Sequence, residues 1–472
     1  MLFLDLGPLI RSILAPLIGV YFASQSIAVL YIFNLGASIL GWTITILLTW
    51  MCLFIVRARL KNNSINVFRK YCFEKWDSAT FLGGLLLYSL LAYVFVKTGE
   101  ATVVPDSTQF EGVGRLISQG GRISDKVPWL SFLVNGRLLV IGALHALNRL
   151  FGAYALYGYF PLVSTWFLIF LGSLILTCSQ FENRKVSIAL TIIIIASLGC
   201  YKNFYQYAFM IHSNITAMIY FSSAIISVYV YSRTNQKSWL FFGSLSMGVA
   251  TLVRTDMLLF SLVFLIAMSS LENLKYSILK YCLIIFFLVS LPWRALTLPF
   301  VPTHSFYVNT DQILLLIFLN ICVAILMVLS RKYLNSTQWL EPASYIAYAV
   351  LTLIVFIVSP EIVGHGWNLF VKYIMIGYDN WLSLTLLILL LIVSYPSLRG
   401  RDPNLGILIS SILLFFVTLF YLVGISGYEF EDHSANRMVL HILPVVIFVM
   451  ANGIESSLSH LAINGRRAMN TR

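Results

Sequence analysis

The chain contains few charged residues. Charged side chains make up 11% of its 472 residues and hydrophobic side chains 59%, whereas soluble domains average about 25% charged and about 45 to 50% apolar residues. The mean hydropathy is +0.87. This composition excludes a soluble globular enzyme and indicates a protein that lies almost wholly in a membrane.

Cysteine is also scarce, and the first residues lack the features of a cleaved signal peptide. The six cysteines lie in or beside apolar runs or in the basic segment 57–80, so we expect neither a disulfide framework nor a cysteine metal site. The first apolar stretch runs from Leu9 past Leu30 without a basic start or a small-residue cleavage site. We therefore interpret it as a retained span.

Apolar runs that could cross a bilayer as helices recur along the whole chain. A helix of about 20 residues spans the ~30 Å hydrocarbon core with its backbone hydrogen bonds satisfied internally. We predict an all-α, polytopic transmembrane bundle of about 14 spans. The predicted spans are 9–31, 36–56, 81–97, 154–180, 186–200, 215–232, 239–254, 255–270, 277–297, 313–330, 344–361, 381–397, 405–427 and 438–455.

Basic residues lie between these spans and not in a patch that would bind nucleic acid. Because Lys and Arg concentrate in cytoplasmic loops of membrane proteins, the net charge of +12 predicts an orientation and no nucleic-acid partner. Both termini are then cytoplasmic, and the longest external loop covers about residues 98–153. The cytoplasmic segments are 57–75, 182–185, 233–237, 272–280, 331–332, 399–401 and the C-terminal tail.

One apolar segment, Arg137–Phe151, does not fit this alternation as a span. It has helical periodicity, but a crossing there would reverse the side of every later loop. We therefore expect an amphipathic helix that lies flat on the outer surface. Its Leu, Ile and Phe side chains would be buried, and Arg137, His145 and Arg149 would lie at headgroup level.

Four short motifs follow one another in an order that resembles a known family. They are Pro105-Asp106-Ser107 before the amphipathic segment and Leu150-Phe151-Gly152, the Gly-containing segment 243–256, Leu291-Pro292-Trp293-Arg294, and Asn436-Arg437 before a span with Pro444. Over about residues 81–472 this order resembles the GT-C superfamily of membrane glycosyltransferases, especially the protein O-mannosyltransferase and aminoarabinose-transferase branch. Residues 1–80 would be an addition of two transmembrane helices and a basic cytoplasmic loop.

The resemblance implies an enzyme that moves a hexose or pentose, with inversion, from a polyprenyl-phosphate carrier to an acceptor on the outer face. The acceptor would be a glycan, a lipid or a protein. Family members place acids in the first external loop, where this chain has Asp106 as the candidate general base. A positioned base contributes about 10²- to 10⁴-fold to the rate. A helix cap at Asp106 is the alternative, and the two roles are compatible.

The departing lipid phosphate requires fixed cations, preferably arginines, whose planar fork matches phosphate oxygens. A second interpretation of Arg254 is a structural ion pair with Asp256, which a tight turn between two short spans would allow. Both interpretations remain open from the sequence. The predicted phosphate-binding residues, at outer span ends or in external loops, are Arg254, Arg294, Arg437, Arg137 and Lys372.

The predicted substrate-binding residues are His212, Asn214, Asp256, Glu111, Trp293 and His304. Residues 211–214 stand where many family members have a second carboxylate, which this chain lacks there. Asn214 also begins a glycosylation sequon. We predict no cofactor and no metal, although the acidic cluster at 429–433 leaves a divalent metal as the alternative.

A lipid-linked-sugar flippase or another polytopic transporter is the main alternative function. Fourteen spans suit a transporter, but transporters carry paired half-repeats and charges near the midplane. The ionisable residues of this chain cluster instead at one predicted surface. The lack of long soluble loops favours a bacterial inner membrane, with the site on the periplasmic face and with membrane lipids and the polyprenyl-phosphate sugar as partners.

Overall fold

The computed structural model describes residues 17–19, 21–22, 105–119, 137, 139–145, 148–149, 163–165, 167–172, 174–175, 188–189, 191–193, 195–196, 204, 213–297, 310–358, 360–361, 364, 367–368, 404–425 and 438–452. Within these residues the regular structure is helical, and no strand occurs. The prediction of an all-α chain is confirmed for this part of the protein.

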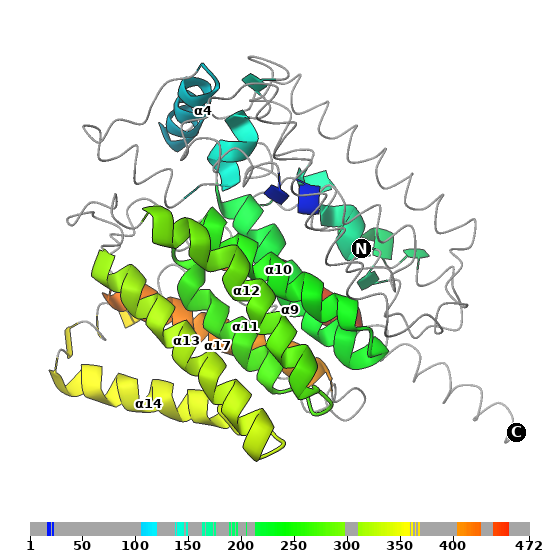
Figure 1. Ribbon diagram of the computed structural model, residues 1–472, viewed down its shortest axis with the longest axis vertical. Coiled ribbons are helices and arrows are strands. Elements are labelled where there is room, and N and C mark those ends of the chain that lie inside the picture. Colours follow the sequence, from blue (N-terminus) through cyan, green and yellow to red (C-terminus); the bar gives the residue numbers. More distant parts are fainter. Residues whose placement is uncertain are drawn as a thin grey trace, which may run out of the picture.

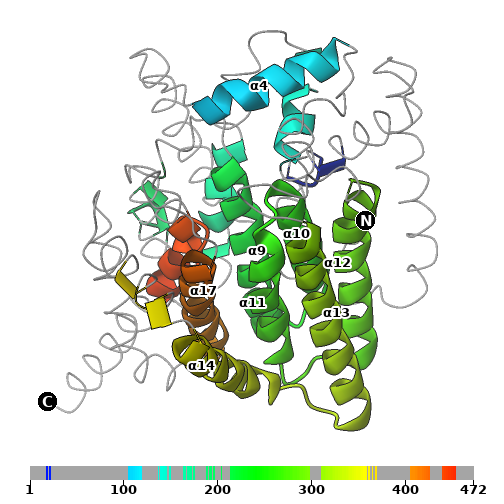
Figure 2. The same cartoon turned by 90° about the vertical axis from the view of Figure 1, so that its left-hand side faces the viewer.

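Eight helices carry labels in Figures 1 and 2. They are α4 (Pro105–Ser118), α9 (Ser213–Thr234), α10 (Lys237–Val253), α11 (Met257–Ser269), α12 (Tyr276–Thr297), α13 (Thr310–Tyr333), α14 (Leu340–Val358) and α17 (Leu405–Ile425). Four of the described helices, α9, α12, α13 and α14, are long and apolar enough to cross a membrane. The chain is therefore a helical membrane protein.

Helix α9 is the centre of the bundle. Its residues 213–231 are all buried, although five of them are serine or threonine and three are tyrosine. Helix α10 packs along α9 and α12, while α11 contacts α9, α10, α13, α14 and α17. Helices α13 and α14 lie outside this group (Figure 1), and many of their Leu, Ile and Val side chains are exposed. Such exposed apolar faces suit contact with lipid.

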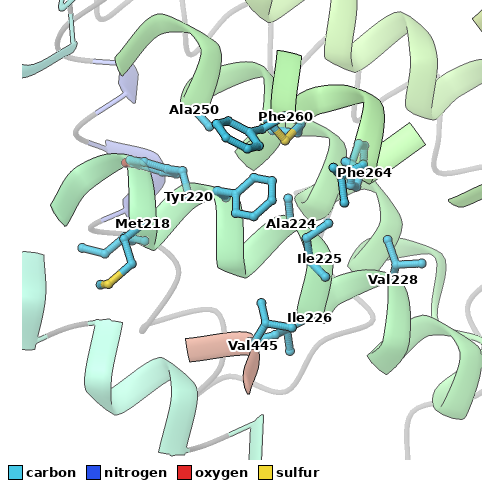
Figure 3. Packing of buried hydrophobic residues seen from close by; sticks show 14 of the residues in the cluster. Met218, Tyr220, Ala224, Ile225, Ile226, Val228, Ala250, Phe260, Phe264 and Val445 are labelled. Atoms are coloured by element: carbon cyan, nitrogen blue, oxygen red, sulfur yellow. The ribbon is translucent and has the colours of Figure 1, made fainter. Parts of the chain in front are cut away.

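Three phenylalanine rings join α9, α11 and α17. The Phe260 and Phe415 rings stack at a centroid distance of 4.5 Å, and Phe221 lies 5.5 Å from Phe415 and 6.1 Å from Phe260. Figure 3 shows the neighbouring packing, in which Phe260 and Phe264 lie beside α9 residues such as Ala224. Aromatic pairs of this kind add about 0.5–1.5 kcal/mol beyond the area that they bury.

Two glycines let α10 approach its neighbours closely. A Cβ on Gly243 would lie 3.2 Å from the Ala224 carbonyl oxygen on α9. A Cβ on Gly248 would lie 2.8 Å from the Val289 side chain on α12, closer than real Cβ atoms come. The glycines in the predicted motif 243–256 therefore serve close helix packing, as small residues do between membrane helices.

Arg331 joins the C-terminal ends of α11 and α13. Its Nη1 donates to the Asn335 carbonyl at 2.9 Å and its Nη2 to the Leu271 and Glu272 carbonyls at 3.0 and 2.6 Å. Its Nε donates to the Leu274 carbonyl at 2.5 Å. These carbonyls follow the end of α11 or α13, where backbone acceptors have no partner within the helix. The side chain is buried and charged, so it caps both helices at once.

Two residues near the start of the chain pack with the central helix. Leu17 and Tyr21 are buried in the same hydrophobic core as α9, and the Tyr220 hydroxyl donates to the Leu17 carbonyl. The division at residue 80 stays a prediction.

Helix α4 packs against residues 139–145. A Cβ on Gly114 would lie 3.1 Å from Leu144 Cβ, and residues 139–145 are all buried. His145 is fully buried in this packing, so its side chain does not face a headgroup layer as the amphipathic pattern predicted. Arg149 is exposed and donates to the Ser118 carbonyl at 3.2 Å, and the depth of this segment in a membrane stays a prediction.

The described contacts distinguish two ends of the bundle. We name the end with residues 254–256 and the start of α9 the α10–α11 end, and the end with residues 270–275 and Arg331 the α11–α12 end. Helix α4 lies across the α10–α11 end (Figures 1 and 2).

Candidate functional site

A three-residue turn interrupts the apolar sequence between α10 and α11. Arg254 is extended, with φ −147° and ψ 137°, and Asp256 returns to helical dihedral angles with φ −62° and ψ −21°. The Met257 and Leu258 amides donate to the Arg254 and Thr255 carbonyls at 3.2 and 3.0 Å. This geometry brings two side chains two positions apart to one side of the chain, which a continuous helix would not do.

Arg254 and Asp256 form a forked ion pair in this turn. Arg254 Nη2 lies 2.7 Å from Asp256 Oδ2, and Arg254 Nε lies 3.0 and 3.1 Å from the two carboxylate oxygens. Both side chains are buried. Asp is a favoured N-cap residue, but this carboxylate makes no cap hydrogen bond to the α11 backbone. It binds the arginine instead.

Arg254 also reaches the first turn of α9. Its Nη1 donates to the Asn214 side-chain oxygen and lies 3.5 Å from the Ser213 hydroxyl oxygen. All three nitrogens of the guanidinium therefore have a partner within the protein. The structural pairing that the sequence left open is present, and it ties the α10–α11 turn to the central helix.

Arg294 approaches the same turn from α12. Its Nη1 donates to the Thr255 hydroxyl at 3.3 Å, and its Nη2 donates to the Thr251 carbonyl in the last turn of α10. A cation at the end of a helix interacts favourably with the helix dipole. Arg294 is 2% exposed, so a second buried guanidinium lies next to the ion pair.

Arg137 and His441 complete the charged group. Both lie near Asp256, and Arg137 also lies near Arg294. The forked ion pair with Arg254 stabilises the ionised form of the Asp256 carboxylate. We name Arg137, Arg254, Asp256, Arg294 and His441 the charged cluster.

The structure brings together some of the predicted site residues and separates others. Asn214 and Asp256 contact Arg254, as described. Glu111 is buried on α4 and pairs with Arg115 at 2.7 Å. Trp293, next to Arg294, is part of the hydrophobic core. Asn214 is fully buried, so its sequon is inaccessible in the folded protein.

Other predicted residues lie outside the described part of the chain. These are Arg437 and Lys372 among the predicted phosphate ligands and His212 and His304 among the predicted substrate ligands. Asp106 is described as a helical residue in the first turn of α4, but its side chain is not described. Its role stays a prediction.

Sequence reasoning missed three members of the site. Thr251 and Thr255 bind Arg294 through a carbonyl and a hydroxyl, and His441 lies near Asp256. A single threonine in an apolar helix carries no pattern that would single it out. His441 lies in the motif from Asn436 to Pro444, where only Arg437 was predicted to bind a ligand.

Among the described residues no group of three or more His, Cys, Asp or Glu side chains could hold a metal ion. The acidic cluster at 429–433 lies outside them. The charged cluster itself has more guanidinium groups than carboxylates, a composition that suits an anion and not a cation.

Comparison of the chain with protein-family models, curated proteins and solved structures gave no match.

Proposed function

We propose that this protein is a membrane glycosyltransferase that moves a sugar from a polyprenyl-phosphate carrier to an acceptor. The observation that supports this proposal is the charged cluster at one end of a membrane bundle, in which Arg254, Asp256 and Arg294 are buried. A buried cation is costly unless it is paired. The cluster combines three guanidinium groups with one carboxylate, and a lipid phosphate at this end would add a second negative charge.

The neighbouring elements suit a reaction at this end. Arg137 stands immediately before the segment 139–145, on which α4 packs through Gly114. The first turn of α4 contains Asp106. A base on α4 and cations in the bundle would thus flank a lipid headgroup, which is the arrangement that an inverting transfer needs.

The proposed reaction is a single displacement. The acceptor hydroxyl attacks C1 of the sugar, and its proton passes to the Asp106 carboxylate. The bond between C1 and the phosphate oxygen breaks, its electron pair stays on that oxygen, and polyprenyl phosphate leaves. Arg294 and Arg137 would stabilise the charge that develops on the phosphate, and the configuration at C1 would invert.

The same proposal includes a GT-C-like fold of about 14 spans, a location in a bacterial inner membrane, and a site on the periplasmic face of that membrane. The acceptor would be a glycan, a lipid or a protein. A divalent metal at the acidic cluster stays the alternative to a metal-free reaction.

A binding experiment tests the phosphate site. The purified protein in lipid nanodiscs is titrated with radiolabelled polyprenyl phosphate, the part that all such donors share. Arg294→Gln removes one charge from the cluster and should weaken binding about tenfold or more, as expected for a charged hydrogen bond to phosphate. Lys332→Gln, an exposed change at the α11–α12 end, is the matched control and should bind as the wild type does. Equal affinity of all three proteins would contradict the proposed site.

A further inference from the structure

Thr255 stands between the two members of the ion pair and contacts the next arginine. Its side chain is 5% exposed, and its hydroxyl accepts a hydrogen bond from Arg294 Nη1 at 3.3 Å. The turn holds this residue from both sides, because Arg254 and Asp256 bind each other across it. The backbone of Thr255 is therefore held in place relative to α9, α10 and α11.

Arg294 has two described anchors, and they act on different nitrogens. The Thr251 carbonyl accepts from Nη2 and the Thr255 hydroxyl from Nη1. The Thr255 contact thus adds a second hydrogen bond, on a different nitrogen from the one that binds Thr251. Two anchors on the two Nη atoms fix both the position and the plane of the group, which decides where a bidentate arginine can meet phosphate oxygens.

We propose that Thr255 is a positioning residue whose hydroxyl sets the plane of the Arg294 guanidinium for contact with the lipid phosphate, an inference that rests on the proposed function. The Arg254–Asp256 pair serves the same end, because it holds the turn in which Thr255 lies. Arg254 then has a structural role, because it holds the turn that positions Thr255. Of Arg254 and Arg294, it is Arg294 that contacts the phosphate.

Isosteric substitutions separate this role from packing. Thr255→Val keeps the volume and removes the hydroxyl, whereas Thr255→Ser keeps the hydroxyl. Thr337→Val is the matched control, since Thr337 is also buried and donates to the Ser269 carbonyl at 2.7 Å but lies at the α11–α12 end. Each variant is titrated in nanodiscs with radiolabelled polyprenyl phosphate and, separately, with the uncharged polyprenol.

Thr255→Val should weaken polyprenyl phosphate binding about three- to tenfold, the effect of misplacing one charged hydrogen bond. Polyprenol binding should not change, because only the phosphate meets Arg294. Thr255→Ser should restore the affinity for the phosphate, and Thr337→Val should leave both affinities unaltered.

The other outcomes overturn the inference in distinguishable ways. If Arg294→Gln weakens phosphate binding but Thr255→Val does not, the positioning role is wrong and the proposed function stands. If Thr255→Val weakens the binding of both lipids, or Thr337→Val weakens phosphate binding equally, the effect is general loss of structure. If Arg294→Gln itself binds normally, the phosphate site and this inference both fail.

Discussion

The substitution Gly248→Ala tests the closest helix contact in the bundle. The added Cβ would lie 2.8 Å from Val289 Cβ and Cγ1 and 3.1 Å from the Phe286 carbonyl oxygen. Val289 is β-branched and holds one rotamer in a helix, so it cannot turn away, and α12 must move from α10. Overpacking of this kind costs about 1–3 kcal/mol, and we expect a value in the upper half of that range.

The assay is equilibrium unfolding in mixed micelles with increasing SDS, followed by tryptophan fluorescence. Gly112→Ala on α4 is the matched control, because a Cβ there meets nothing within 4 Å. Alanine in a helix interior is favoured over glycine by about 0.5–1 kcal/mol, so the control should unfold at the same or a higher SDS fraction. Gly248→Ala should also weaken polyprenyl phosphate binding, since the displaced α12 carries Arg294 away from Thr251 and Thr255. If the two alanine variants unfold alike, α10 and α12 do not approach each other as described.

Two further predictions concern buried basic side chains. Arg331→Met removes the donor that caps α11 and α13 and should lower the free energy of unfolding by about 3 kcal/mol or more, whereas the exposed Lys332→Met should change it little; equal effects in SDS titration would refute the capping role. Burial and the charge of Arg149 lower the pKa of His145 to about 4, below its ordinary 6.5, so the unfolded chain takes up a proton before the folded protein does. Stability should therefore fall as the pH drops from about 6.5 to 4, and His145→Asn should reduce this fall in thermal unfolding curves; an unchanged pH dependence would show that other groups cause it.

The helices were predictable because a membrane imposes a length on them. The spans predicted at 215–232, 277–297 and 313–330 match α9, α12 and α13 within a few residues, since about 20 apolar residues in a row have few other stable structures in lipid. The break between α10 and α11 was also predicted, because polar residues interrupt the apolar run at 254–256.

The contacts at the site were only partly predictable. The sequence left the Arg254–Asp256 pair open, because residues two apart meet only if the backbone between them turns, and that depends on dihedral angles. The burial of His145 was not predicted, because helical periodicity shows which side chains share a face but not which other parts of the chain pack on that face. Thr255 was missed because its role depends on a hydrogen bond with Arg294 on α12, and these two residues are 39 positions apart in the sequence.

The proposed reaction breaks the bond between a sugar and a polyprenyl phosphate. The most direct measurement uses the protein in sealed vesicles with polyprenyl phosphate that carries a radiolabelled sugar, together with membrane extract as a source of acceptors. The wild type should move the label from the lipid to another molecule, whereas Asp106→Asn should bind polyprenyl phosphate normally and transfer no label. Label that crosses the vesicle membrane still attached to its carrier would contradict the account and identify a flippase instead.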